Sequence, residues 1–163
     1  MRFIGITGGV GAGKSEILGY LAKKPDTRVM LADEIAHELM SPGTACYDKI
    51  SETFGAEDIF LPQGGLDRGK LAAVIFSDEA KRRQMNAIVH PAVRVYVEKE
   101  AAREKQGGKR KLLVLEAALL IEEHYDEICD ELWYIYTRED IRRERLMASR
   151  GYSTEKVDRI FAS

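Results

Sequence analysis

The sequence predicts an α/β fold built on a parallel β-sheet, and three observations lead to it. Four short apolar segments have the length and composition of strands that are covered on both faces. Segments with helical periodicity separate them, as the crossover connections between parallel strands require. A glycine-rich loop joins the first strand to the first helix. Because ligands bind at the carboxyl ends of the strands in such sheets, functional residues are expected there.

The first part of the chain predicts two strand–helix pairs. Each strand is a short apolar run without polar alternation, and each helix has apolar residues at helical spacing. Proline follows both helices and marks where they end. The predicted strands run from Arg2 to Thr7 and from Thr27 to Leu31, and the predicted helices from Lys14 to Lys23 and from Asp33 to Met40.

The middle of the chain differs, because helical periodicity is almost continuous between residues 45 and 105. The segment Pro62–Gly65 and the His90-Pro91 step interrupt it, and Asp67 and Ser77 are predicted as helix N-caps. This region is therefore expected to be a helical insertion.

Two further strands are predicted after this insertion, from Leu112 to Glu116 and from Leu132 to Tyr136. The sequence Thr137-Arg138-Glu139-Asp140 has the form of a capping box and predicts a helix that continues to about Ser149. Ser153 is expected to cap a last helix.

Composition narrows the class of protein. The chain has 163 residues, of which 45% are apolar and 32% charged, and its formal net charge is −2. These values are typical of one ordinary globular domain and provide no basic surplus for nucleic acid or an anionic membrane. The longest apolar run, Ala117 to Ile121, is far shorter than the roughly 20 residues of a membrane span.

The cysteines and the N-terminus indicate a location. Cys46 and Cys129 lie outside any C-x-x-C pattern, so neither a disulfide framework nor a zinc site is predicted. Glycine ends the first apolar run too early for an export signal. We therefore expect a cytoplasmic protein, whose oligomeric state the sequence leaves open.

The strongest motif is the phosphate-loop pattern G-x-x-x-x-G-K-[ST], which lies between a predicted strand and a predicted helix. Its glycines let backbone N–H groups turn inward and form a nest for phosphate oxygens at the positive end of the helix. A glycine-rich turn without a ligand is the competing interpretation, and the strand–helix context argues against it. The residues of the motif are Gly8, Gly9, Val10, Gly11, Ala12, Gly13, Lys14 and Ser15.

This motif predicts a fold of the P-loop nucleoside triphosphate hydrolase type that binds ATP and Mg²⁺. Lys14 reaches the β and γ phosphates, and the Ser15 hydroxyl ligates the metal. Glu16 stands where many such loops have a second hydroxyl; its carboxylate suits the helix dipole but lies near the bound phosphate. No N-K-x-D guanine signature occurs, which leaves kinases and ATPases.

Further motifs follow the loop in a fixed order. They are A-D-E-I-A-H-E-L ending in P-G, L-D-R-x-x-L with I-F, N-A-I-V-H-P-A-V, and A-L-L-I-E. In this order and spacing the sequence resembles the dephospho-coenzyme A kinase family over essentially its whole length. The resemblance implies ATP-dependent phosphorylation of the ribose 3′-hydroxyl of dephospho-coenzyme A, with no nucleic-acid or membrane partner.

The resemblance also implies a division of the chain. Residues 1–44 and 112–136 would form the P-loop core, residues 45–105 a substrate-binding region, and residues 137–163 a lid with its following helix. The family usually continues past the position of Ser163 with another strand and a terminal helix, so these elements are expected to be absent from this chain.

Asp33 and Glu116 are the two acidic site residues that the resemblance favours. Asp33 matches the family's catalytic aspartate and would orient the acceptor hydroxyl, although spacing alone fits a helix N-cap equally well. Glu116 ends a strand where a magnesium-associated acid is expected, and a solvated strand end is its alternative.

The remaining candidates are arginines and the residues around them. Arg150, and with it Arg145, matches the lid arginines that close over the transferring phosphoryl group, although an exposed charged helix explains most of the basic residues there. The resemblance also favours substrate contacts for Arg68, His90, Arg94 and Leu119. A solvated charge is the alternative for the two arginines, and a buried or capping side chain the alternative for His90.

Two other functions stay open at this point. A P-loop kinase for another small acceptor would share the first half of the chain. A nucleotide-binding module without catalysis would keep the loop and bind ATP without turnover.

Overall fold

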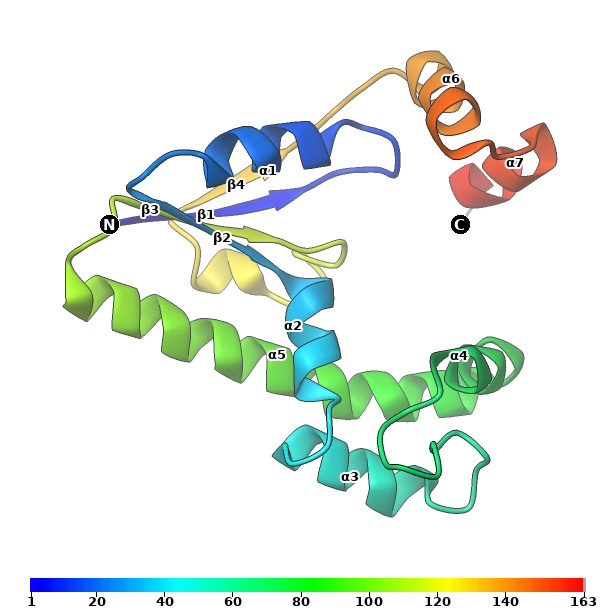
Figure 1. Cartoon of the computed structure of the whole chain (residues 1–163). Helices are drawn as coiled ribbons and strands as arrows, with labels where there is room; N and C mark the ends of the chain where they lie inside the picture. Colours follow the sequence, from blue (N-terminus) through cyan, green and yellow to red (C-terminus); the bar gives the residue numbers. More distant parts are fainter. Residues whose placement is uncertain (163) are drawn as a thin grey trace. The chain divides into compact units, whose positions relative to one another are not determined.

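The computed structural model describes residues 1–162, which divide into two compact units. The sheet unit comprises Met1–Met30 and the chain from Glu104 onward, and the helical unit comprises Leu31–Arg103. The elements, in chain order (Figure 1), are β1 (Arg2–Thr7), α1 (Lys14–Ala22), β2 (Thr27–Leu31), α2 (Ala32–Leu39), α3 (Ala45–Phe54), α4 (Arg68–Ser77), α5 (Glu79–Gly107), β3 (Leu112–Glu116), the 3₁₀ turn η1 (Tyr125–Glu127), β4 (Glu131–Tyr134), α6 (Glu139–Arg150) and α7 (Thr154–Ala162).

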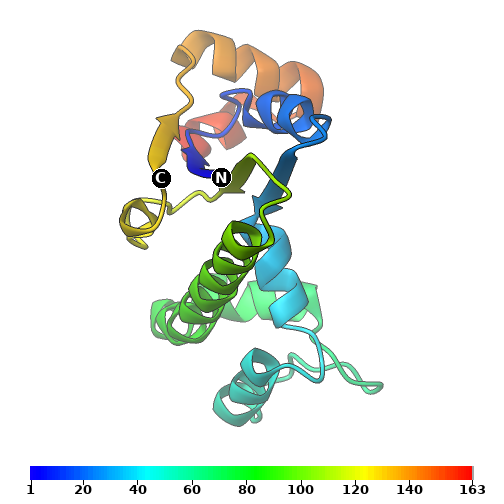
Figure 2. The same cartoon turned by 90° about the vertical axis from the view of Figure 1, so that its left-hand side faces the viewer.

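The predicted parallel sheet is confirmed, with strand order β2-β3-β1-β4. Strand β1 pairs in parallel with both neighbours, so that Ile4 lies opposite Val114 on one side and Glu131 on the other. Strands β2 and β3 start side by side, because the amides of Lys111 and Leu112 both donate to the carbonyl of Asp26. Figures 1 and 2 show α1 on one face of the sheet and the segment around η1 on the other.

The sheet is buried at its centre and open at one edge. The middle of β3, Leu113–Leu115, is fully buried, and β1 is buried from Phe3 to its end. Strand β4 forms the edge and leaves Trp133 39% exposed, with its indole N–H donating to Glu131 at 3.1 Å. It also ends earlier than the predicted Tyr136, because after one more hydrogen bond, from Ile135 to Thr7, the chain turns away toward α6.

One long helix dominates the helical unit. Helix α5 runs for 29 residues through Pro91, so the predicted break at His90-Pro91 is wrong. A proline inside a helix removes one backbone hydrogen bond and costs about 3 kcal/mol. A buried stripe at four-residue spacing continues on both sides and offsets that cost; it consists of Met85, Val89, Val93, Val97 and Ala101.

Of the two helix N-caps predicted for this unit, one is confirmed and one is wrong. Asp67 caps α4 as predicted, since its side chain accepts from the amides of Gly69 and Lys70. Ser77 does not cap α5, because it is the last residue of α4, and Asp78 accepts from the amides at the start of α5 instead.

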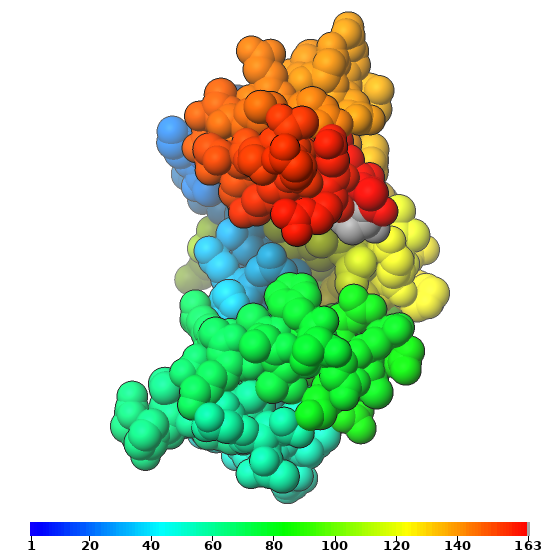
Figure 3. Space-filling view, turned by 90° about the vertical axis from the view of Figure 1, so that its right-hand side faces the viewer, coloured from blue at the N-terminus to red at the C-terminus, as the bar shows by residue number. Residues whose placement is uncertain are grey.

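Helices α6 and α7 pack as a pair at the end of the chain and form one continuous surface, orange to red in Figure 3. Gly151 ends α6 in a left-handed conformation, and the Ser153 hydroxyl accepts from the amide of Lys156, as predicted. The predicted capping box is wrong, because Thr137 bonds elsewhere and Arg138 occupies the cap position. No helix within residues 1–162 is long and apolar enough to cross a membrane.

Candidate nucleotide-binding site

The loop between β1 and α1 has the backbone that the glycine pattern predicts. Gly8, Gly11 and Gly13 have φ values of 148°, 79° and 97°, in the region that favours glycine. A turn inside the loop is closed by the amide of Ala12, which donates to the carbonyl of Gly9 at 3.1 Å. Helix α1 follows at Lys14 with no side-chain cap, so the amides of its first turn face the loop. Such an arrangement of amides is suited to phosphate oxygens.

Lys14 is bound tightly to the start of the loop. Its ammonium group donates to the carbonyl of Gly8 at 2.5 Å and reaches the carbonyl of Gly9 at 3.5 Å. The side chain is only 17% exposed, and Glu116 lies 3.8 Å away at the end of β3. The strand arrangement therefore brings a cation and a carboxylate together beside the glycine loop.

The donor set around the loop fits a magnesium ion bound to phosphates. Ser15 exposes its side chain in the first turn of α1, and Glu116 presents a carboxylate at the neighbouring strand end. No group of three or more His, Cys, Asp or Glu residues able to hold a metal occurs among the described residues. Mg²⁺ commonly takes only one or two protein ligands and completes its shell with water and phosphate, so the set is sufficient.

Residues at the start of α6 also hold the loop. The Thr137 hydroxyl donates to the carbonyl of Ala12 at 2.8 Å, and Arg145 reaches the same carbonyl at 3.4 Å. Arg142 donates from Nε to the carbonyl of Val10 at 2.9 Å. The sequence predicted a capping box for Thr137 and no contact for Arg142, because spacing alone cannot show a contact across more than 120 residues.

Arg150 lies at the last position of α6, exposed to solvent. A hydrogen bond from Arg150 is the main reason that the pKa of Tyr152 lies below its ordinary value, and the nearby charge of Lys156 adds to the effect. The Lys156 ammonium group lies 3.7 Å from the centre of the Tyr152 ring. Two cationic side chains, Arg150 and Lys156, thus lie beside Tyr152 at the end of α6.

The other predicted acid, Asp33, belongs to the helical unit. It is the second residue of α2 and is exposed, while Leu31 occupies the N-cap position. The competing interpretation of Asp33 as an N-cap is therefore wrong, and its side chain is exposed to solvent.

The helical unit contains a cavity of about 340 Å³ between the end of α2, the 61–66 segment and α4. Arg68, at the start of α4, contributes a positive charge to its lining, and His37 contributes an imidazole. The other lining residues are mostly apolar: Met40, Ser41, Pro42, Leu61, Gly65, Leu66, Leu71, Ala72 and Ile75.

The remaining sequence candidates have separate positions. His90 and Arg94 lie one helical turn apart on α5, both half-buried, and Arg94 donates to Glu98 at 2.9 Å. Leu119 is 45% exposed in the turn after β3. The structure thus groups Lys14, Ser15, Glu116 and Arg145 around the loop, and it assigns Asp33, Arg68, His90 and Arg94 to the other unit.

A family model described as dephospho-CoA kinase matches residues 2–163. A dephospho-CoA kinase of Symbiobacterium thermophilum is 37% identical over 158 residues, which are 97% of this chain and 65% of that protein. One from Oceanobacillus iheyensis is 41% identical and is matched over 98% of this chain and 79% of its own length. The chain thus spans slightly less than two thirds of the first relative and about four fifths of the second.

Two solved structures have the same fold. TT1252 from Thermus thermophilus superposes with a TM-score of 0.77 at 27% identity, over 99% of this chain and 78% of that one. Dephospho-CoA kinase from Campylobacter jejuni superposes with a TM-score of 0.66 at 20% identity, over 97% of this chain and 78% of that one.

Proposed function

Since the chain belongs to the dephospho-CoA kinase family, we propose that it transfers the γ-phosphoryl group of ATP to the ribose 3′-hydroxyl of dephospho-CoA, giving CoA and ADP. The glycine loop with Lys14 in place carries this proposal, because it supplies the amides and the cation that a triphosphate needs. The reaction draws on ATP and a coenzyme precursor, which favours the cytoplasm as its location.

The loop residues would hold the donor. In this proposal the loop from Gly8 to Ser15 surrounds the β and γ phosphates. The amides of Gly9, Gly11 and Gly13 face the phosphates, Ala12 closes the turn with its amide, and Glu16 lies just beyond. Lys14 would leave its backbone carbonyls and bind phosphate oxygen, a stronger charge-assisted partner. Ser15 would ligate Mg²⁺ directly and Glu116 through water, and the bound ion would neutralise charge on the phosphates.

Asp33 would handle the acceptor. It lies two residues after the end of β2, and β2 belongs to the same parallel sheet as the strand that leads into the loop. An aspartate carboxylate is a weak base at neutral pH, so its main contribution would be to orient the 3′-hydroxyl and accept its proton late in the transfer.

The cavity of the helical unit would bind the rest of the acceptor. The arm of dephospho-CoA beyond its diphosphate is long and uncharged, which suits the mostly apolar lining, while Arg68 suits the diphosphate itself. His90, Arg94 and Leu119 are further proposed contacts of the acceptor.

Arginines of α6 would complete the site. Arg145 already touches the loop carbonyl of Ala12 and would contact ATP, and Arg150 would stabilise the transferring phosphoryl group. Exclusion of water on closure strengthens such contacts.

The direct test is ADP release with a panel of acceptors. The expected result is rapid turnover with dephospho-CoA and slow turnover with nucleosides and shikimate. Turnover with dephospho-CoA no faster than with water would contradict the substrate assignment and favour a kinase for another small acceptor. ATP binding without turnover for any acceptor would indicate a nucleotide-binding module.

A further inference from the structure

The carbonyl groups of the glycine loop are held from outside the loop, by residues that lie more than 120 positions further along the chain. The carbonyl of Val10 accepts from Arg142, and the carbonyl of Ala12 accepts from Thr137 and Arg145. Alternate carbonyls of the loop are therefore fixed by the start of α6.

This pattern determines where the loop amides point. In a trans peptide the C=O and N–H groups of one unit point in opposite directions. A donor that holds the carbonyl of Val10 therefore directs the amide of Gly11 the opposite way, and the same holds for Ala12 and Gly13. Neither glycine amide donates to any residue within residues 1–162. Both are thus oriented and available for a ligand.

Of the two arginines, Arg142 has the more extensive contact with the loop. A Cβ atom built on Gly9 would lie 2.6 Å from Nη2 of Arg142, so the guanidinium packs against the bare backbone at that glycine. The backbone carbonyl oxygen of Arg142 would lie 3.2 Å from a Cβ atom built on Gly11. Arg142 therefore spans three consecutive residues of the loop.

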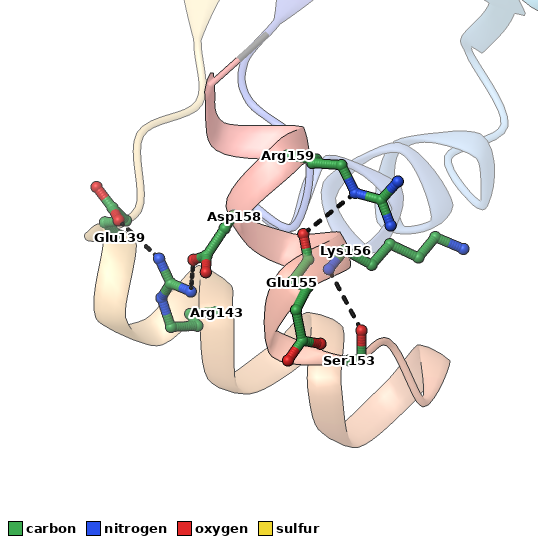
Figure 4. Close-up of polar contacts among 7 residues, drawn as sticks. All are labelled: Glu139, Arg143, Ser153, Glu155, Lys156, Asp158 and Arg159. Carbon is green, nitrogen blue, oxygen red and sulfur yellow. Dashed lines mark hydrogen bonds and ion pairs between the residues drawn. The ribbon is translucent and has the colours of Figure 1, made fainter.

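A second element supports this arginine. The guanidinium carbon of Arg142 lies 4.4 Å from the centre of the Phe161 ring on α7, within the range of a cation–π contact. The ring therefore packs against the same guanidinium that donates to Val10. Arg143 lies 5.3 Å from the centre of the same ring and pairs with Glu139 and Asp158, which ties α6 to α7 (Figure 4).

We propose that Arg142 is a positioning residue for the nucleotide: it fixes the peptide between Val10 and Gly11 so that the Gly11 amide faces the phosphates, with Phe161 holding its guanidinium in place. The inference rests on the proposed function, because it takes ATP as the ligand of the loop. It assigns α7 an indirect part in ATP affinity.

The test compares ATP affinity with stability in purified variants of the full chain. Arg142→Met removes the donor and keeps the length of the side chain, and should raise the dissociation constant for ATP about tenfold, as expected for one charge-assisted hydrogen bond. The KM for dephospho-CoA should stay close to the wild-type value. Arg142→Lys, which keeps a cationic donor, should recover part of the loss, and Phe161→Leu should show a smaller loss.

The matched control is Asp158→Asn, which weakens the contact between α6 and α7 but removes none of the atoms by which Arg142 contacts Val10 and the Phe161 ring. It should lower the melting temperature without changing the ATP dissociation constant. An unchanged constant in Arg142→Met, or an equal rise in Asp158→Asn, would overturn the proposal. Failure of the wild type to bind ATP would instead overturn the proposed function.

Discussion

The ammonium group of Lys14 lies 3.8 Å from the Glu116 carboxylate while it donates to the carbonyl of Gly8. The lysine is thus held at the mouth of the loop by two kinds of acceptor. A bound triphosphate would replace them with phosphate oxygens and leave Glu116 to interact with the hydrated metal.

Glu116→Gln tests this exchange. The amide keeps the shape of the side chain but removes the charge that would attract hydrated Mg²⁺. We expect kcat to fall about tenfold, the Mg²⁺ concentration at half-maximal rate to rise, and ATP binding without metal to change little. Steady-state assays across a Mg²⁺ titration measure this. Glu122→Gln, at an exposed position in the following turn, is the control and should behave as wild type.

Asp33→Asn removes the proposed proton acceptor. Turnover should fall by about two to four orders of magnitude, while the ATP dissociation constant stays within about twofold, because only the acceptor loses its orienting carboxylate. Rapid-quench assays and calorimetry give the two values. Glu34→Gln changes the neighbouring exposed acid of the same helical turn and should keep its activity. Wild-type turnover in Asp33→Asn would remove Asp33 from the mechanism.

Ala72→Trp tests whether the cavity of the helical unit binds the acceptor arm. The indole ring would fill part of the cavity that Ala72 lines. We expect kcat/KM for dephospho-CoA to fall at least tenfold, and kcat/KM for AMP, which has the same 3′-hydroxyl without the arm, to change little. Ala73→Trp, exposed and outside the cavity lining, is the matched control. Equal losses for the two acceptors would contradict this use of the cavity.

Cys129 should react slowly and with a characteristic pH dependence. Burial raises the pKa of its thiol from 9.0 to about 12, and the charges of Asp130 and Asp126 add to the effect. At pH 8 this lowers the thiolate fraction by about a thousandfold, an effect offset in part by the higher nucleophilicity of a more basic thiolate. In a Cys46→Ser background, the rate with an aromatic disulfide should rise about tenfold per pH unit beyond pH 9. A plateau near pH 9 would contradict the raised pKa.

The same shift has a consequence for stability. A thiol whose pKa is raised by folding leaves stability unchanged below pH 9, where it is protonated in both states. Above pH 9 the unfolded chain releases its proton first, so the free energy of unfolding should fall as pH rises toward 12. In urea titrations, the difference in the free energy of unfolding between the wild type and Cys129→Ser should be constant below pH 9 and shift against the wild type above it.

Local pattern predicted most of the fold. The strands Arg2–Thr7, Thr27–Leu31 and Leu112–Glu116 have the predicted bounds, because uninterrupted apolar runs between glycine, proline and charged turns have few alternatives. The error at Pro91 arose because a buried stripe on α5 outweighs one missing hydrogen bond. Rules based on local sequence register the proline but contain no information on the residues against which the buried stripe packs.

The candidate site was less predictable than the fold. The glycine pattern identified the loop and Lys14, because each position of that motif has its own physical requirement. The contacts of Thr137 and Arg142 with the loop depend on where β4 leads the chain, and residue spacing contains no such information. For Asp33 and Arg68 the sequence proposes roles that enzyme assays must test.

The half-exposed indole of Trp133 on the edge strand gives the protein an intrinsic fluorescent probe. Trp133 is the sole tryptophan. It lies on β4 opposite Ile6 of β1, the strand that runs directly into the glycine loop. A fluorophore at that place, partly wetted and hydrogen-bonded to Glu131, responds to small changes in its surroundings. Intrinsic emission therefore reports on the edge of the sheet beside β1, without an attached dye.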